Sequence, residues 1–456
     1  MVAAQIAGQP LAPAPVAVGA VSASTDLLYL QPAPGLTTAH LIRGLGELGL
    51  DVVDSSHQEG VRVRVSDAGG AEALAARLAD SGLVRSVEAD VLVSAARTPN
   101  DPGYVVSQYA YLETVRAPEA WEMQTGHDGI VIAIVDTGVD YTHPDLRSQL
   151  YENRAERFDG RDEDENGCAD DFSGCNFVSL ATADPSCGYT QGPPHWRAMD
   201  DEGHGTFVAG LAAADGDNEI GIAGIAWDAR ILPVKVLDCT ATGRISDAAA
   251  GIRYAARSGA DVINISFGTQ TDSPALREAV EFARASGSIV VASAGNDGRR
   301  GLTYPARYDG VISVAASGLL RFNGIDYQAT APFANFGGSV DFLAPGVSVL
   351  STVPERLCGQ DGWNCSDGPY ASGNGSSFAT PIVAGAVALV RAQHPELSPD
   401  FIVQLLLATR SAGATVADSP VLDIAAAVGR PIFSGGIPGI SRDGGGDEIA
   451  PGPAAN

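Results

Sequence analysis

The sequence predicts an α/β fold in which a mostly parallel sheet is flanked by helices on both faces and is preceded by a small α+β domain. From Tyr104 to about Phe433, short β-branched apolar runs alternate with amphipathic helical patterns, which is typical of a parallel sheet. Residues 25–95 follow a β-α-β-β-α-β rhythm, which is typical of a split βαβ domain. Residues 96–104 lie between the two regions and have the turn-forming composition of an exposed linker.

This order predicts four segments along the chain. We expect a flexible N-terminal segment over 1–24, the small domain over 25–97, the large domain over 98–433, and a flexible tail over 434–456 that is rich in Gly, Pro and Ala. The elements expected in the small domain are strands at 26–31, 61–65 and 84–91 and helices at 38–48 and 71–81.

Apolar runs in the large domain predict strands that are buried on both faces. They lie at 130–135, 231–237, 261–265, 288–292 and 311–315. Ser273-Pro274 and Ser398-Pro399 each provide an N-cap followed by a first-turn proline, so helices should begin there. In open sheets of this kind, chemistry gathers at the carboxyl ends of the strands.

The composition excludes several classes of function. The 456 residues contain 28 Lys and Arg against 55 Asp and Glu, so the formal net charge is −27. This charge repels phosphate backbones and anionic lipid, so we expect no binding to nucleic acid or to a membrane surface. No apolar run approaches the roughly 18 residues that a membrane span needs, which predicts a soluble protein.

Cysteine usage bears on the cellular compartment. Cys168 and Cys175, like Cys358 and Cys365, each close a short loop rich in Gly, Asp and Asn, which favours disulfides and an oxidising compartment. Reduced thiols in a cytosolic enzyme are the alternative, and the pairing of the other two cysteines stays open. Residues 1–24 contain no Lys or Arg, so they are not an intact secretory signal but are compatible with a linker left after its removal.

Three reactive side chains lie at element boundaries in the large domain. Asp136 ends a buried strand, where a carboxylate that orients a histidine would lie. His204 precedes the small-residue helix predicted at 207–214, and the helix dipole keeps such a histidine neutral and able to act as a base. Ser377 enters the first turn of an apolar helix, whose positive end favours a nucleophile. Each residue also has an ordinary interpretation, namely a turn cap, a turn histidine and an N-cap serine.

Together with a fourth segment, Ala294-Gly295-Asn296, these residues resemble the motifs of the subtilisin-like serine proteases (subtilases, peptidase family S8). The similar motifs are Ile134-Val135-Asp136-Thr137-Gly138, His204-Gly205-Thr206-x-Val208-Ala209-Gly210 and Gly375-Ser376-Ser377-x-Ala379-Thr380-Pro381. The resemblance covers residues from about 104 to 430, and the order Asp, His, Ser is that of subtilisin itself. It implies a subtilisin-like fold and a serine endopeptidase.

The resemblance implies a role for each matched residue. Ser377 would be the nucleophile, His204 the general base and acid, and Asp136 the carboxylate that holds the imidazole. Asn296 would donate its side-chain amide to the oxyanion of the tetrahedral intermediate. Phe207 stands where many relatives have a second histidine, outside this proton-transfer chain.

The resemblance also implies the segments that bind substrate. Ser266-Phe267-Gly268 would pair with an extended peptide and form one wall of the S1 pocket, and Ala292-Ser293-Ala294, followed by Gly295, would form the opposite wall. No acidic residue lies in either wall, so we expect an apolar or broad preference at P1.

Structural calcium is the cofactor that the resemblance implies. At the strong site of the family this chain has the side chains of Gln108, Asp145 and Asn218, and the backbone carbonyls of Gly216, Ile220 and Ile222 would complete an all-oxygen shell. A second candidate is the run Asp162-Glu163-Asp164-Glu165-Asn166-Gly167, which begins like a calcium loop. A solvated acidic loop is the alternative for this second run.

The small domain resembles the propeptide of secreted subtilases, most clearly in residues 83–90. It would then act as a folding chaperone and temporary inhibitor of its own enzyme, with self-cleavage around Ala95–Thr98; a permanent small domain is the alternative.

We expect a secreted, monomeric, self-processing zymogen that acts on proteins or peptides. An inactive relative that binds peptides and a sedolisin-like acid peptidase are competing functions, but the base of the second class is a glutamate rather than His204. The sequence does not separate general digestion from maturation of one client protein.

Overall fold

The computed structural model divides the chain into two compact units. The described residues are 16–18, 27–54, 60–65, 70–90, 98–181, 183–190, 197–322, 325–337, 340–360, 362–410 and 420–429. The first unit contains those up to residue 90 and the second those from residue 98 onward. The predicted tail, most of the predicted segment 1–24, and residues 95–97 of the predicted cleavage region lie outside the described residues.

The first unit is a five-stranded sheet with two helices. Its strand order is β1-β5-β2-β4-β3, in which β2 is antiparallel to both of its neighbours. The bounds are β1 Ala17–Val18, β2 Leu27–Pro32, α1 Thr38–Glu47, β3 Val52–Asp54, β4 Val61–Arg64, α2 Gly70–Ala79 and β5 Val84–Ala89. From β2 to β5 the elements follow the predicted β-α-β-β-α-β order. The core consists of leucines and valines from both helices and the sheet, among them Leu28, Leu30, Leu41, Leu45 and Leu78.

The second unit is built on an eight-stranded sheet in which every strand pairing except β11–β12 is parallel. The strand order is β12-β11-β10-β9-β6-β8-β7, and β13 also pairs with β11. The bounds are β6 Val131–Asp136, β7 Cys175–Asn176, β8 Arg230–Lys235, β9 Val262–Ile265, β10 Ile289–Ser293, β11 Ile312–Phe322, β12 Ile325–Thr330 and β13 Phe342–Pro345. All five predicted strands are confirmed within one residue at their starts, and β11 continues to Phe322, seven residues beyond its predicted end.

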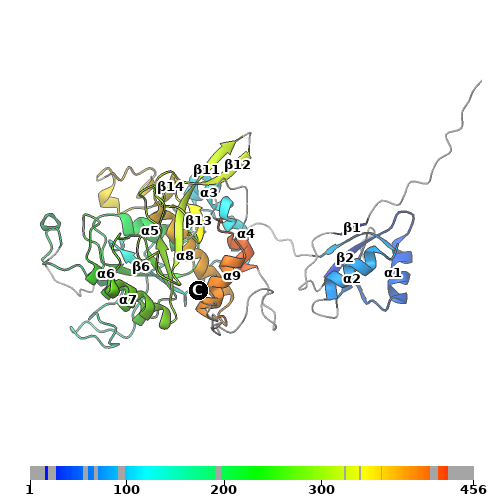
Figure 1. Cartoon of the computed structure of the whole chain (residues 1–456), viewed down its shortest axis with the longest axis horizontal. Helices are drawn as coiled ribbons and strands as arrows, with labels where there is room; N and C mark the ends of the chain where they lie inside the picture. The colour runs from blue at the N-terminus through cyan, green and yellow to red at the C-terminus, as the bar shows by residue number, and fades with distance from the viewer. Residues whose placement is uncertain are drawn as a thin grey trace, which may run out of the picture. The chain divides into compact units, whose positions relative to one another are not determined.

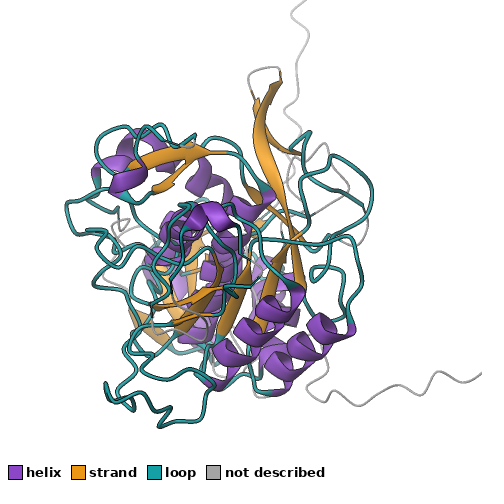
Figure 2. Cartoon of the chain, turned by 90° about the vertical axis from the view of Figure 1, so that its left-hand side faces the viewer, coloured by secondary structure: helices purple, strands orange, loops and turns teal. Residues whose placement is uncertain are grey.

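Helices lie on both sides of this sheet (Figure 2). The longer ones are α5 His204–Ala213, α6 Ile245–Arg257, α7 Pro274–Ala285, α8 Ser376–Gln393 and α9 Pro399–Ala408. The shorter ones are α3 Tyr109–Leu112, α4 Ala117–Trp121 and α10 Ile424–Val428. Ser273 and Ser398 cap α7 and α9 by accepting hydrogen bonds from backbone N–H groups of the first turn, as predicted.

The sheet order brings three functional segments to one edge. Strands β10, β9 and β6 are adjacent and parallel, so their carboxyl ends adjoin. Asp136 ends β6, Ser266 follows β9, and residues 294–296 follow β10. Helix α8 contacts β6, β9 and β10 and packs against α5, so segments far apart in sequence meet here.

Two hairpins and three disulfides complete the second unit. Strands β11 and β12 form a long hairpin that projects from the sheet (Figure 1), and β14 Val349–Thr352 pairs with β15 Tyr370–Gly373. The disulfides predicted within the two short loops are confirmed, and a third joins the remaining two cysteines; the pairs are Cys168–Cys175, Cys187–Cys239 and Cys358–Cys365. None of the helices in the described ranges combines the length and apolar character that crossing a membrane requires.

Candidate active site

Asp136 is a completely buried carboxylate at the end of β6. Its Oδ1 accepts a hydrogen bond from the backbone N–H of Thr137 at 2.7 Å and lies 2.8 Å from His204 Nδ1. Its Oδ2 is buried and has no hydrogen-bond partner among the described residues. The imidazole is therefore the side chain that interacts most directly with this negative charge.

His204 is the first residue of α5, three residues earlier than the predicted helix. Gly203 precedes it with φ +108°, a backbone conformation that glycine adopts without the strain that other residues incur. Asp200 fixes this turn because its carboxylate accepts hydrogen bonds from the N–H groups of Gly203 and Thr206, both at 2.8 Å. With Nδ1 engaged by Asp136, Nε2 is the ring nitrogen left for proton exchange.

Opposing effects set the acidity of this imidazole. Burial disfavours its charged form, but the Asp136 carboxylate and, less strongly, Glu202 and Asp200 favour it, so the pKa of His204 is raised from 6.5 to about 9. The expectation that the helix dipole keeps this histidine neutral is therefore wrong, because the neighbouring carboxylates outweigh the dipole. Glu202 is close to the ring because its carboxylate accepts the backbone N–H of His204 at 2.8 Å. The imidazole can accept a proton as a base only above this raised pKa.

Ser377 lies in the first turn of α8 and is 7% exposed. A Cβ placed on the preceding Gly375 would lie 2.8 Å from Ser377 Oγ and 3.6 Å from Asn296 Nδ2. The hydroxyl and the amide therefore border the same small space, which only a glycine leaves open. The ring of Phe378, the next residue in the helix, is 5.4 Å from the His204 ring, so α8 and α5 meet at the predicted pair.

Hydrogen bonds hold the backbone around Ser377. Asn296 Oδ1 accepts the N–H of Ser376 at 2.8 Å, which leaves its Nδ2 to donate elsewhere. The Ser266 hydroxyl donates to the carbonyl of Ser377 at 2.8 Å and itself accepts from Asn264 Nδ2 at 3.0 Å. The start of α8 is thus attached to the ends of both β9 and β10.

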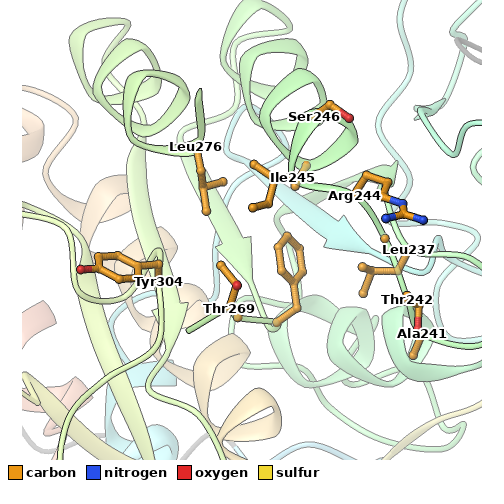
Figure 3. A pocket seen from close by; sticks show the side chains of 13 residues that line it. Leu237, Ala241, Thr242, Arg244, Ile245, Ser246, Thr269, Leu276 and Tyr304 are labelled. Carbon is orange, nitrogen blue, oxygen red and sulfur yellow. The ribbon is translucent and has the colours of Figure 1, made fainter. Parts of the chain in front are cut away.

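The two predicted walls of the substrate pocket differ in accessibility. Phe267 and Gly268 line a pocket of about 670 Å³, and Figure 3 shows other side chains pointing into it, among them Leu237, Ile245 and Leu276, with Tyr304 at its edge. In contrast, the side chains of Ala292, Ser293 and Ala294 are buried in and after β10. Of the second wall only Gly295 is partly exposed, because helices such as α8 and α7 pack against β10 and cover the side chains of the rest.

Most of the predicted calcium residues meet on the loop that follows α5. Asn218 Nδ2 donates to Asp145 Oδ1 at 3.0 Å, and the Ile222 N–H donates to Asp145 Oδ2 at 2.9 Å. Gly216 and Ile220 belong to the same loop. Burial raises the pKa of Asp145 to about 6, and nearby Asp101 adds to this shift.

Gln108 does not fit the predicted set. Both ends of its buried amide bond the backbone of Ala223, with Nε2 donating to the carbonyl at 3.0 Å and Oε1 accepting the N–H at 2.9 Å. Asp101 is better placed: it is fully buried, Oδ2 accepts the Asp217 N–H at 2.7 Å, and Oδ1 has no partner among the described residues. At this loop Asp101 therefore has a carboxylate oxygen without a partner among the described residues, whereas both ends of the Gln108 amide are already hydrogen-bonded.

The second calcium candidate forms a compact acidic loop. Carboxylate oxygens of Glu156, Asp162 and Asp164 lie within 4.8 Å of one another. Asp162 also accepts the N–H groups of Asn166 and Gly167 at 3.1 and 2.9 Å. These backbone bonds shape the loop and leave three carboxylates grouped where a cation could bind.

Two charged residues beside the site were not predicted. Lys235 is the one lysine in the sequence and is 1% exposed; its Nζ donates to the Thr137 carbonyl at 2.6 Å and to Asp201 Oδ1 at 2.7 Å. It therefore ties the end of the Asp136 strand to the turn before His204. Asp101 lies beside the loop that follows α5, in a segment whose turn-forming composition predicts an exposed linker, yet it is fully buried.

Comparison with known proteins identifies the fold and chemistry. Residues 127–426 match the family described as the subtilase family. The thermophilic serine proteinase of Bacillus sp. (strain AK1) is 37% identical over 352 residues, which are 77% of this chain and 74% of that protein. Thermitase of Thermoactinomyces vulgaris is 36% identical over 296 residues, 65% of this chain and 86% of that protein. A solved structure titled as proteases from Pseudoalteromonas arctica PAMC 21717 superposes with a TM-score of 0.58 at 29% identity, covering 73% of this chain and 99% of that one. The chain therefore belongs to the subtilase family, and it is a serine endopeptidase.

Proposed function

We propose that this protease hydrolyses peptide bonds through Asp136, His204 and Ser377. The observation that carries the proposal is the 2.8 Å contact between His204 Nδ1 and the fully buried carboxylate of Asp136. His204 begins α5, and α5 packs against α8, the helix that bears Ser377. In the first step Ser377 Oγ attacks the scissile carbonyl while His204 Nε2 takes its proton. The imidazolium then protonates the leaving amine, and water repeats the sequence on the acyl-enzyme.

Asn296 would stabilise the oxyanion of the tetrahedral intermediate. The bond from the Ser376 N–H to Asn296 Oδ1 fixes the amide so that Nδ2 borders the space beside Ser377 Oγ. The Ser377 N–H lies in the first turn of α8, where amides have no intrahelical acceptor. Two donors therefore converge where negative charge develops.

The substrate would bind as an extended chain along Ser266-Phe267-Gly268. The 670 Å³ pocket beside Phe267 and Gly268 is lined largely by apolar side chains, so it suits an apolar side chain of the peptide (Figure 3). An apolar or broad preference at P1 remains our expectation. We infer that proteins and peptides are the substrates and that the enzyme acts as a monomer.

Calcium would bind the loop after α5 through Asp101, Asp145 and Asn218, with the carbonyls of Gly216, Ile220 and Ile222. Two observations support the fit. The carboxylates of Asp101 and Asp145 are buried and form no ion pair with a described lysine or arginine. Asp101 Oδ1 also has no hydrogen-bond partner among the described residues. Oxygen donors of this kind suit Ca²⁺, which would neutralise the carboxylates and fasten the start of the second unit to this loop. The Glu156, Asp162 and Asp164 group is a second candidate site for the same ion.

The first unit would be a propeptide, and the enzyme a secreted zymogen. Its split βαβ order and its likeness to secreted subtilase propeptides in residues 83–90 support this, and the three disulfides of the second unit suit an oxidising compartment. Self-cleavage around residues 95–98 would then release the enzyme from inhibition.

The proposal is tested with wild type and Ser377→Ala, each purified in millimolar calcium. We expect wild type to lose about 95 residues and to hydrolyse casein, and a serine-directed sulfonyl fluoride to abolish the hydrolysis. The variant should stay full length and inactive. If wild type is itself inactive but binds peptides, the chain is an inactive relative and the proposal is wrong. Equal activity of the two proteins would exclude Ser377 as the nucleophile.

A further inference from the structure

A disulfide-closed loop lies against the turn that carries His204. The Cys358–Cys365 loop, which comprises residues 353–369 and is described except at 361, connects β14 to β15. Within it, the Trp363 N–H donates to the Gln360 carbonyl and the Trp363 carbonyl accepts the Gly359 N–H, at 2.9 and 2.7 Å. The disulfide and these two bonds fix the backbone of Trp363, whose side chain is half-buried.

Trp363 makes a direct polar contact with the residues before His204. Its indole Nε1 donates to the carbonyl of Glu202 at 2.8 Å, and the carboxylate of Glu202 accepts the N–H of His204 at 2.8 Å. A Cβ on Gly203 would lie 2.6 Å from the same indole nitrogen, so the ring rests directly on the turn. Arg356 of the loop also donates to the carbonyl of Asp200.

A row of aromatic rings provides a second connection to the imidazole. The ring centroid of Trp363 is 5.4 Å from that of Phe207, which is fully buried one turn after His204. The ring centroid of Phe378 is 4.1 Å from that of Phe207 and 5.4 Å from that of His204. The loop therefore contacts both the backbone before His204 and the rings packed beside it.

We propose that Trp363 is a positioning residue for His204 and that the Cys358–Cys365 disulfide holds Trp363 in place for this purpose. The inference rests on the proposed function of His204 as the general base. Trp363 touches no reacting atom; it acts by fixing the turn from Glu202 to His204 and, through Phe207 and Phe378, the plane of the imidazole relative to Ser377. A loop that served stability alone would affect the amount of folded enzyme but not the turnover of each folded molecule.

The test compares Trp363→Phe, Trp363→Ala and the double variant Cys358→Ala/Cys365→Ala with wild type. The matched control is Cys168→Ala/Cys175→Ala, because it removes a disulfide with the same separation of 7 residues. Hydrolysis of a chromogenic peptide is measured in saturating calcium, and kcat is divided by the folded fraction obtained from circular dichroism. Trp363→Phe keeps an aromatic ring beside Phe207 but loses the hydrogen bond to the Glu202 carbonyl. It therefore separates the effect of the hydrogen bond from that of the ring contact, even if the other variants fold poorly.

We expect kcat to fall roughly 3–10-fold in Trp363→Phe and up to roughly 10²-fold in Trp363→Ala and the double variant, with KM nearly unchanged, as for a misplaced catalytic group. The acid limb of kcat/KM should move to lower pH as the contact between Glu202 and His204 loosens. The control should keep wild-type kcat and pH profile. If wild type is active but the loop variants keep its kcat per folded molecule and its pH profile, the inference is overturned while the proposed function stands. If wild type itself is inactive, the proposed function fails and the inference fails with it.

Discussion

His204 Nδ1 lies 2.8 Å from Asp136 Oδ1, while Oδ2 of the same buried carboxylate has no partner among the described residues. The charge of Asp136 is therefore dispersed by few donors and acts mainly on the imidazole. This contact keeps the proton of neutral His204 on Nδ1, so that Nε2 can accept one. It also stabilises the imidazolium that forms when a general base takes a proton during peptide hydrolysis.

The substitution Asp136→Asn should remove this charge with little change in shape. The side-chain amide that it introduces can donate to Nδ1 and so favour the wrong tautomer, for which serine proteases of the trypsin class lose about 10⁴-fold in kcat. We expect a loss of similar size, measured with a chromogenic peptide. An unchanged melting temperature would show that the fold is intact, and a loss below about tenfold would contradict the assigned role of Asp136.

The activity of wild type should rise with pH on the alkaline side of neutrality. His204 acts as a base only when neutral, and its raised pKa places that change above the usual 6.5. In Glu202→Gln, a negative charge that favours the imidazolium is removed while an acceptor for the His204 N–H remains. The pKa of His204 should fall, and the acid limb of kcat/KM should move to lower pH. An acid limb of kcat/KM that stays at the same pH or moves to higher pH would show that Glu202 does not raise the pKa of His204.

Asn296→Ala should weaken catalysis without weakening binding. In the role proposed for Asn296, the amide donates to charge that develops only in the transition state, so kcat should fall while KM changes little. A loss of about 10²–10³-fold in kcat is expected, the size known for an oxyanion donor in a subtilisin. A rise in KM with normal kcat would instead make Asn296 a residue that binds the ground state of the substrate.

Asp101 and Gln108 can be separated by calcium removal. If Asp101 is a ligand, wild type at about 100 times the dissociation constant gains about 2.7 kcal/mol from calcium, and Asp101→Asn should lose most of this gain. Gln108→Ala loses hydrogen bonds to Ala223 instead, so it should be destabilised equally in calcium and in chelator. Thermal unfolding of the Ser377→Ala forms avoids autolysis. If Gln108→Ala instead loses the stabilisation by calcium and Asp101→Asn keeps it, Gln108 is the ligand and Asp101 is not.

The sequence marks most of the proposed site residues because they lie where periodic patterns end. Asp136 ends an apolar strand and Ser377 starts an apolar helix, so the pattern itself marks both positions. The parallel order of β10, β9 and β6 then brings Asn296, Ser266 and Asp136 to one edge, and α5 and α8 add the other two residues.

Contacts that depend on chain folding far from a motif could not be read in this way. The Gly103 N–H bonds the Gly221 carbonyl at 2.6 Å, which brings Asp101 beside the proposed calcium loop, whereas the amide of Gln108 is engaged by Ala223 at the end of that loop. Strands β12, β14 and β15 were not predicted, since each depends on its antiparallel pairing partner. Trp363 gave no signal either, because its contact with Glu202 joins residues 161 positions apart.

The most direct test of the account is covalent labelling of the nucleophile. Wild type and His204→Ala are treated with a fluorophosphonate, and the adduct is located by peptide mass spectrometry. We predict a single label on Ser377 that forms at least about 10²-fold more slowly without the imidazole, because the hydroxyl then has no base. A label on another serine, or equal labelling rates in the two proteins, would contradict it.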